Sequence, residues 1–281
     1  MTKQIPVNPK ETTRTEKLKF KDIPINIYQE DLETECLRWG KNKLCEALRH
    51  MLIIREFETM LDAFKSKGRY RDIEYNYKGP AHLSIGQEGV SVGMAMSLTP
   101  DDQIFGSHRS HGEIIAKGLS AIALLDQAAL LMRMESHDSG KLLSFVRDYL
   151  PGSPQIEAEN FLLAGTLGEI FMRDIGFNRG MGGSMHAFFT PFGAYPNNAI
   201  VGGSSGIAVG AALYSQLTNS DRICVANLGD GSTGCGLVWE AMNFAGMAQF
   251  KRLWDPPYDK SLPTLFCFTN NFYAMGGQTK A

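Results

Sequence analysis

Apolar residues recur at the helical period from about residue 41 to residue 67, and Gly68 follows them as a stop signal. This pattern predicts an amphipathic helix. A second helix, built of small residues, is expected over GQEGVSVGMAMSL, and a short strand over residues 103–106. Residues 134–160 have weak periodicity and many loop-forming residues, which predicts a surface excursion.

Two short apolar runs in the second half have the composition of buried parallel strands: RICVANL at 222–228 and TLFCFT at 264–269. An apolar stripe at helical spacing lies between them, from about residue 235 to residue 250. Strand, helix and strand in this order predict a βαβ unit, with adjacent parallel strands if nothing is inserted between them. The predicted fold class is therefore α/β, with a mostly parallel sheet flanked by helices.

Three further segments complete the expected organisation. Small residues at helical spacing over 201–217 predict a helix that packs closely against a neighbour, and the Pro-rich run at 251–263 is expected to loop out at the surface. The first residues mix Lys, Glu, Thr and Pro with few large apolar groups, which cannot offset their ordering entropy. We therefore assign 1–35 to a polar N-terminal arm and 36–281 to the α/β domain.

Composition narrows the possible functions. The 281 residues are 43% apolar, enough for a sizeable core, and a net charge of -2 gives no basic field for a nucleic acid. The five cysteines are odd in number and contain no CxxC pair, which favours a reducing cytoplasm over a disulfide framework or a zinc site. The N-terminus has no apolar signal region, and no run of eighteen apolar residues occurs, so neither secretion nor membrane insertion is expected.

Polar residues follow directly after both predicted parallel strands. Gly229-Asp230-Gly231 ends the first strand, and Asn270-Asn271 ends the second. Because the carboxyl ends of parallel strands meet at one edge of a sheet, these turns should share a ligand site. Glycines let the backbone approach a ligand, the following helix favours an anion, and one carboxylate with neutral oxygens suits magnesium. A lone GDG or NN is commonly only a turn, but the two together predict a magnesium–diphosphate site.

The segments GDGSTGCGLVWEAMNFA and TLFCFTNNFYAMGGQT together resemble the thiamine diphosphate motif of the 2-oxo acid dehydrogenases, in the alpha subunit of their first, dehydrogenase component. The resemblance continues upstream, in family order, through GPAHLSIGQEGVSVG, DDQIFGSHRSHGEIIAKG, RGMGGSMHAF and NNAIVGGSSGIAVGAAL. It covers roughly residues 50 to 280. It implies the thiamine diphosphate-binding fold, with thiamine diphosphate and Mg2+ as cofactors.

The resemblance also implies roles for the residues at the strand ends. Asp230, the side chain of Asn271 and the carbonyl of Tyr273 resemble the magnesium ligands of the family. The backbone N–H groups of Gly231 and Ser232 would bind the diphosphate.

Four residues upstream match further cofactor-binding positions. Arg109 matches the family arginine that reaches the diphosphate, and a guanidinium suits that role. The family usually has Tyr before this arginine, and this chain has His108. The hydrogen bond that the family makes from this position is therefore left open. Ala199 and Val201 match the stretch whose backbone supports the cofactor between its ring and its diphosphate, although the family often has Gly at the first position.

The histidines have different expected roles. His82 matches a histidine that faces the substrate, where an imidazole could steady a carboxylate or shuttle a proton. His186, in the Gly-rich loop, either lines the site or fixes the loop. His111 is equally compatible with a supporting hydrogen-bonding role, and Glu88 is expected to make a structural hydrogen bond rather than act as a base.

Two parts expected of the family are lacking. The glutamate that activates the aminopyrimidine comes from the beta subunit in the family, so a beta subunit or a fused beta half is implied, in a heterotetramer that also serves a lipoyl-bearing acyltransferase. The family continues past the metal pair with a histidine-bearing loop that covers the diphosphate. We therefore expect that the domain is incomplete at its C-terminus.

The expected reaction is oxidative decarboxylation of a small 2-oxo acid, pyruvate or a branched-chain acid, with transfer of the acyl group to a lipoyl group. An acetoin dehydrogenase and a transketolase-like ketol transferase use the same cofactor frame and remain alternatives. A non-catalytic subunit that binds a magnesium diphosphate is a third alternative. The joint presence of Arg109, Asp230 and Asn271 favours catalysis. The expected location is the cytoplasm, although an organelle matrix is also compatible.

Overall fold

The computed structural model describes residues 27–274 and 277–278, together with the isolated positions 8, 10, 17 and 22. Most of the predicted N-terminal arm lies outside these residues. Helix α2 (Leu32–Trp39) spans the predicted boundary at residue 35 and buries none of its side chains. The division into an arm and a domain stays a prediction.

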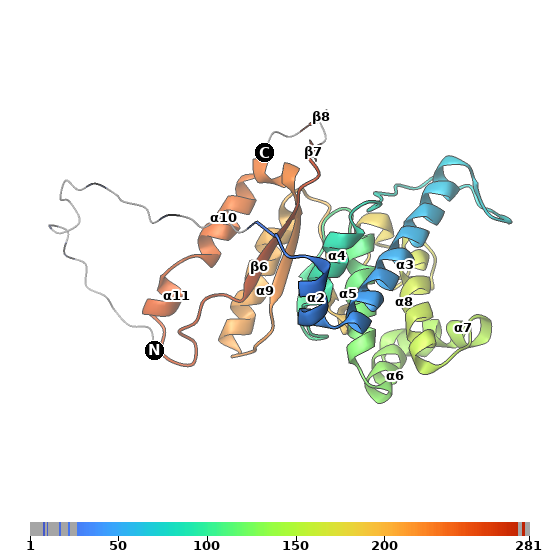
Figure 1. The fold of residues 1–281 in the computed structure, drawn as a ribbon, viewed down its shortest axis with the longest axis horizontal. Coiled ribbons are helices and arrows are strands. Elements are labelled where there is room, and N and C mark those ends of the chain that lie inside the picture. Colours follow the sequence, from blue (N-terminus) through green and yellow to red (C-terminus); the bar gives the residue numbers. More distant parts are fainter. Residues whose placement is uncertain are drawn as a thin grey trace.

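A four-stranded parallel sheet lies beside the helical part of the fold (Figure 1). Its order is β4-β3-β5-β6, formed by β3 (Gln103–Phe105), β4 (Ala194–Tyr195), β5 (Cys224–Gly229) and β6 (Thr264–Thr269). β5 and β6 are direct neighbours, and Gly229 is paired with Thr269 at their carboxyl ends. The predicted α/β class and the predicted βαβ unit are confirmed.

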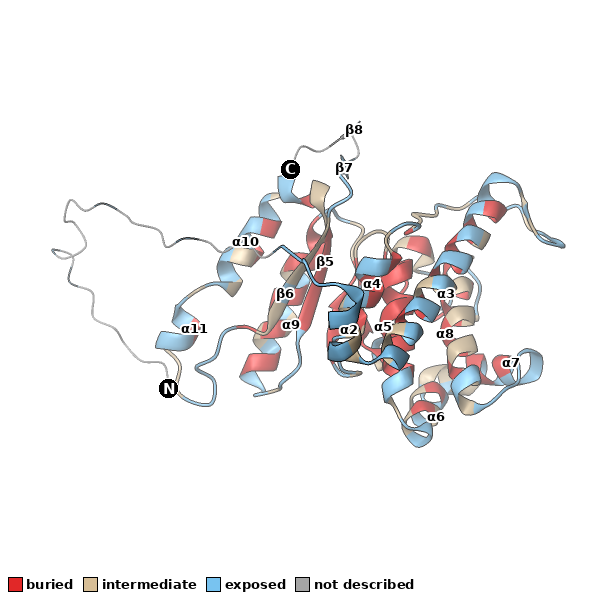
Figure 2. Ribbon diagram, viewed as in Figure 1, coloured by how far each residue is buried: buried red, intermediate tan, exposed pale blue. Residues whose placement is uncertain are grey.

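Alternate residues of the strands face two separate cores, because side chains of a strand point to opposite faces. Ala226 packs with α9 (Gly203–Leu217) and α10 (Gly236–Ala245), whereas Val225 packs with the helical half of the chain. Figure 2 shows β5 between these layers, and all of its residues except Gly229 are buried. The short helix α11 (Gln249–Arg252) adds Phe250 to the first core.

Within the described residues, the helical part of the fold contains, after α2, the helices α3 (Lys41–Ser66), α4 (Glu88–Ala95), α5 (His111–Leu124), α6 (Gln127–Glu135), α7 (Lys141–Tyr149) and α8 (Pro154–Ile170). Helix α3 agrees with the predicted helix over 41–67. Its buried face includes Ile54, Phe57 and Leu61, and also Glu58, which has no exposed surface. A carboxyl group therefore lies within an otherwise apolar stripe.

The predicted surface excursion at 134–160 is wrong. Helix α7 buries Leu142, Leu143 and Val146, and α8 begins inside this segment and packs on α5 and α7. Ser153 caps α8 by accepting a hydrogen bond from Ile156 N, and Pro154 follows as its first residue. Ser before Pro is a helix-start signal, which the loop-forming residues around it obscured.

Short elements complete the structure. They are two hairpins, β1 (Arg69–Tyr70) with β2 (Ile73–Glu74) and β7 (Tyr273–Ala274) with β8 (Gly277–Gln278), and the 3-10 turns η1 (His137–Gly140), η2 (Gly183–Met185), η3 (Thr190–Phe192) and η4 (Asp230–Gly234). The Pro-rich run at 251–263 is largely exposed, as predicted, and Gln216 Nε2 anchors it by donating to the carbonyls of Tyr258 and Lys260. Within the described part of the chain, no helix has the length and apolar character needed to span a membrane.

Candidate cofactor site

The segments that follow the four parallel strands lie at one edge of the sheet, where open α/β folds bind ligands. These segments contain every residue predicted to bind the cofactor: His108 and Arg109 after β3, Ala199 and Val201 after β4, Asp230, Gly231 and Ser232 after β5, and Asn271 and Tyr273 after β6. The sheet topology thus gathers residues that are far apart in sequence.

The turns after β5 and β6 begin side by side, because Gly229 and Thr269 are paired. Asp230 opens η4 and is half-buried, and the buried Ser232 side chain fixes the turn by donating to Gly229 O at 2.5 Å. On the β6 side, the exposed Asn271 accepts a hydrogen bond at Oδ1 from Tyr273 N at 3.0 Å. Each turn is therefore stabilised by a hydrogen bond of its own.

The donor set at these turns fits magnesium. Asp230 offers a carboxylate, and Asn271 and Tyr273 offer neutral oxygens, which is a typical protein share for this ion. Among the described residues, no group of three or more His, Cys, Asp and Glu side chains is placed to hold a metal. The assignment of Asp230, Asn271 and Tyr273 as magnesium ligands stays a prediction, and their place after neighbouring parallel strands is compatible with it.

Glycines allow close approach around this edge. A Cβ at Gly231 would lie 2.9 Å from Ala274 Cβ, so the turn after β5 runs directly against β7. Gly202 has a φ of 78°, and a Cβ there would lie 2.8 Å from Val238 Cγ2. The segment with half-buried Ala199 and exposed Val201 is therefore held beside the start of α10.

His82, His108 and Arg109 form the basic side of the site. The two imidazole rings meet edge to face with their centroids 5.4 Å apart. Burial, and after it the positive charge of Arg109, lowers the pKa of both histidines below the ordinary value. Both rings consequently favour the neutral form, in which one ring nitrogen donates and the other accepts.

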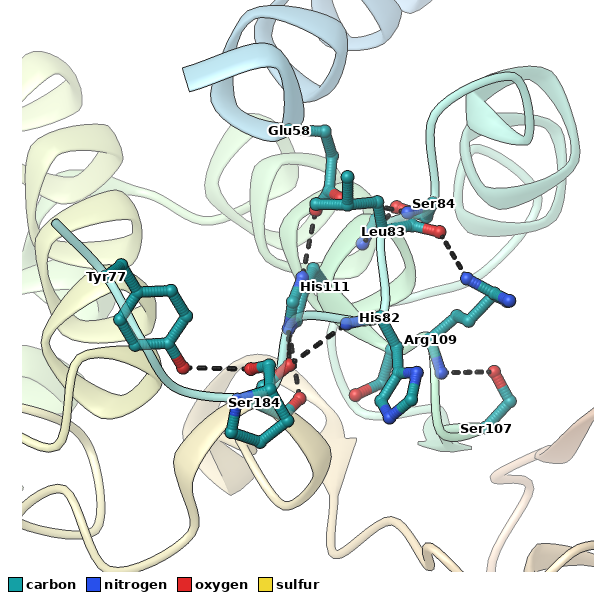
Figure 3. Close-up of polar contacts among 12 residues, drawn as sticks. Glu58, Tyr77, His82, Leu83, Ser84, Ser107, Arg109, His111 and Ser184 are labelled. Atoms are coloured by element: carbon teal, nitrogen blue, oxygen red, sulfur yellow. Dashed lines mark hydrogen bonds and ion pairs between the residues drawn. The ribbon is translucent and has the colours of Figure 1, made fainter. Parts of the chain in front are cut away.

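Arg109 is held at two points. Its Nη1 donates to Leu83 O at 2.9 Å, and its backbone N–H donates to Ser107 Oγ at 3.2 Å (Figure 3). The guanidinium keeps further N–H donors that these two contacts do not use. A cation in a fixed position with spare donors is suited to bind an anion.

A buried network of hydrogen bonds runs from Glu58 through His111 and Ser184 to the backbone of His82 (Figure 3). Glu58 contacts His111 Nδ1 at 3.0 Å and accepts from Ser84 N at 2.9 Å. His111 Nε2 contacts Ser184 Oγ at 2.9 Å, and His82 N donates to the same hydroxyl at 3.4 Å. His111 thus makes the supporting hydrogen bonds that the sequence left open for it. Sequence reasoning missed Glu58, although a Glu inside the apolar stripe of α3 was a usable signal.

The Gly-rich loop that carries His186 is built around Glu169. The buried Glu169 carboxylate accepts from the backbone N–H groups of Asn178, Gly180 and Gly182 at 2.5 to 3.0 Å. His186 itself is exposed at the end of η2. Both roles expected of His186, lining the site and fixing the loop, stay predictions.

Glu88 has the structural role that was expected. Its side chain forms an ion pair with Arg55 at 2.6 Å and accepts from Gly86 N at 3.0 Å. The hydrogen bond from Arg55 lowers the pKa of Glu88 most strongly. The carboxylate therefore holds the start of α4 and is a weak base.

Comparison with known proteins identifies the family. The dehydrogenase E1 component family matches residues 51–149 and 153–281. The chain is 29% identical over 238 residues to the pyruvate dehydrogenase E1 component subunit alpha of Rhizobium meliloti, covering 85% of this chain and 51% of the relative. The subunit alpha of Zymomonas mobilis is 30% identical over 237 residues, covering 84% and 50%.

The mitochondrial subunit alpha of Saccharomyces cerevisiae is 30% identical over 238 residues, which are 84% of this chain and 41% of the relative. The chain thus spans about half the length of the curated relatives it matches. The family depends on thiamine diphosphate and uses Mg2+ to bind its diphosphate. Since the match covers most of the sequence, the chain belongs to the dehydrogenase E1 component family.

Proposed function

We propose that this chain forms the alpha half of a 2-oxo acid dehydrogenase that oxidatively decarboxylates pyruvate or a branched-chain 2-oxo acid and passes the acyl group to a lipoyl-bearing acyltransferase. One observation carries the proposal: every residue predicted to bind the cofactor follows one of four parallel strands at a single sheet edge. Membership of the dehydrogenase E1 component family supports it.

In this proposal the strand ends hold the cofactor. Asp230, Asn271 and the carbonyl of Tyr273 would bind Mg2+, the N–H groups of Gly231 and Ser232 would bind the diphosphate, and Arg109 would neutralise it. When bound, thiamine diphosphate supplies an electron sink for the decarboxylation.

The histidines would act on the substrate side. His82 and His108 are kept neutral by burial and by Arg109, so each ring can donate one hydrogen bond and hold one proton. The backbone of His82 is fixed through Ser184, which gives its ring a defined position. A neutral donor there can steady the carboxylate of an oxo acid before that group is lost.

The proposed partners follow from membership of the dehydrogenase E1 component family. A beta subunit or a fused beta half would supply the glutamate that activates the aminopyrimidine. The cofactor would then lie between the two halves, and this chain alone would be inactive.

The proposal is tested by calorimetric titration of the chain with its beta partner. We expect Mg2+-dependent binding of thiamine diphosphate that Asp230→Ala abolishes, because a magnesium site loses its one carboxylate. Ser120→Ala is the matched control, since it removes one buried side-chain hydrogen bond on α5, to Ala95 O. Unchanged binding in Asp230→Ala would refute the metal site.

The substrate is tested with the same complex. Activity with an artificial electron acceptor is measured on pyruvate, branched-chain 2-oxo acids and acetoin. Turnover of a 2-oxo acid supports the proposal, and turnover of acetoin alone would replace it with acetoin cleavage.

A further inference from the structure

Glu113 is a buried carboxyl group in the first turn of α5. Its two oxygens accept hydrogen bonds from Ser107 N and Ser107 Oγ, both at 2.9 Å. Ser107 Oγ in turn accepts from Arg109 N at 3.2 Å. Two hydrogen bonds therefore connect the carboxyl group to the backbone of Arg109.

The loop between β3 and α5 is built closely around this carboxyl group. A Cβ at Gly106 would lie 2.9 Å from Glu113 Oε2, so the chain passes directly over it. From the segment after β4, Asn197 Nδ2 donates to Ser107 O at 3.2 Å and to Ser110 Oγ at 2.8 Å. Ser107 is thus held from both sides.

An apolar side chain would fill this position at a lower desolvation cost. The next two residues, Ile114 and Ile115, are almost fully buried, and burial raises the pKa of the Glu113 carboxyl to about 7. Burial of an ionisable group is costly unless the group is paired or hydrogen-bonded, as Glu113 is to Ser107. The groups that it serves here are those of the Arg109 loop.

We propose that Glu113 is a positioning residue that presets Arg109 for the cofactor diphosphate through Ser107. The inference rests on the proposed function, because it assumes that Arg109 binds the diphosphate. Arg109 is fixed at its backbone by Ser107 and at its guanidinium by Leu83 O. A cation that is already in place loses less conformational freedom on binding an anion.

The test is the dissociation constant of Mg2+–thiamine diphosphate for the complete complex, measured by calorimetry. Glu113→Leu removes both oxygens that accept hydrogen bonds from Ser107, so Arg109 is no longer held in position. Binding should weaken by about tenfold, the effect of losing one hydrogen bond from Arg109 to the charged diphosphate. Glu113→Gln still accepts from Ser107 N and donates to Ser107 Oγ, so it should remain within about threefold of the native complex. Ser120→Ala, on the same helix, should have no effect.

A coupling measurement separates positioning from general packing. In an Arg109→Gln background, Glu113→Leu should cause no further loss of affinity, because its effect passes through Arg109. Equal losses in the two backgrounds would overturn the inference. If Glu113→Leu fails to fold, Ser107→Ala takes its place, since it removes the acceptor of Arg109 N.

The two proposals fail differently. A native complex that binds no thiamine diphosphate refutes the proposed function and this inference together. A native complex that binds it with Mg2+, and whose Glu113→Leu variant binds equally well, refutes only the role of Glu113.

Discussion

The side of the site that carries His82 and Arg109 is anchored in the helical layer, whereas the side that carries Asp230 and Asn271 rests on short turns. Two buried carboxyl groups hold the first side. Glu58 contacts Ser84 N and His111, and Glu113 accepts a hydrogen bond from Ser107 N. On the second side, Asn271 and Tyr273 are exposed, and Asn271 Oδ1 accepts a hydrogen bond from the nearby Tyr273 N. The side that is proposed to bind the diphosphate is thus anchored by buried residues, while the side that is proposed to bind the metal is exposed at Asn271 and Tyr273.

The largest effect on stability is expected from a substitution on the anchored side, at Glu58. Glu58→Leu leaves His111 and Ser84 N without their buried partner and should lower the free energy of unfolding by about 3–5 kcal/mol. The measurement is guanidinium chloride unfolding followed by circular dichroism. The double variant with His111→Leu should lose less than the sum of the two single variants, and strict additivity would contradict a coupled pair.

The next effect concerns Glu113 and pH. Burial raises its pKa from 4.5 to about 7 in the folded protein, so the folded state binds the proton more tightly than the unfolded state. Its contribution to stability is complete below pH 4.5 and is lost as the pH rises through about 7. Relative to Glu113→Gln, the native protein should lose on the order of 3 kcal/mol between pH 4.5 and pH 9. Parallel stability curves for the two proteins would contradict this assignment.

The third effect tests the exposed side. Asn271→Ala should change the stability of the ligand-free protein by only about 0.5 kcal/mol, because the side chain is exposed and the hydrogen bond at its Oδ1 is local. With Mg2+ and thiamine diphosphate at about 100 times the dissociation constant, the native complex should gain about 2.7 kcal/mol, and the variant should gain far less. Thermal unfolding with and without ligand measures the difference. A large loss without ligand would show that this side is also anchored by folding.

The smallest effect concerns His108, at the position where the resemblance implies that the family usually has Tyr. His108→Tyr should tighten diphosphate binding by a few fold, the gain from one additional hydrogen bond of about 1 kcal/mol. Calorimetric titration of the complete complex measures it. Weaker binding would indicate that the edge-to-face contact with His82 matters more than a phenol donor at this position.

The sequence by itself determined the parts of this protein that depend on local periodicity and on chain order. The helix over 41–67, the strand pair before Asp230 and Asn270 and the helix between them all followed from patterns of apolar residues. The common edge then followed from the topology of parallel strands. The residues at the strand ends are therefore predictable from the sequence alone.

Only the tertiary structure decided which polar residues are buried and what they contact. Glu58 meets His111 across 53 positions of sequence, and His111 meets Ser184 across 73. The helical packing of 134–160 was likewise missed, because α7 and α8 gain their burial from each other and from α5. Local patterns carry no record of such distant partners. In this chain they indicate which residues follow the strand ends, and long-range packing decides which of those residues are held in place.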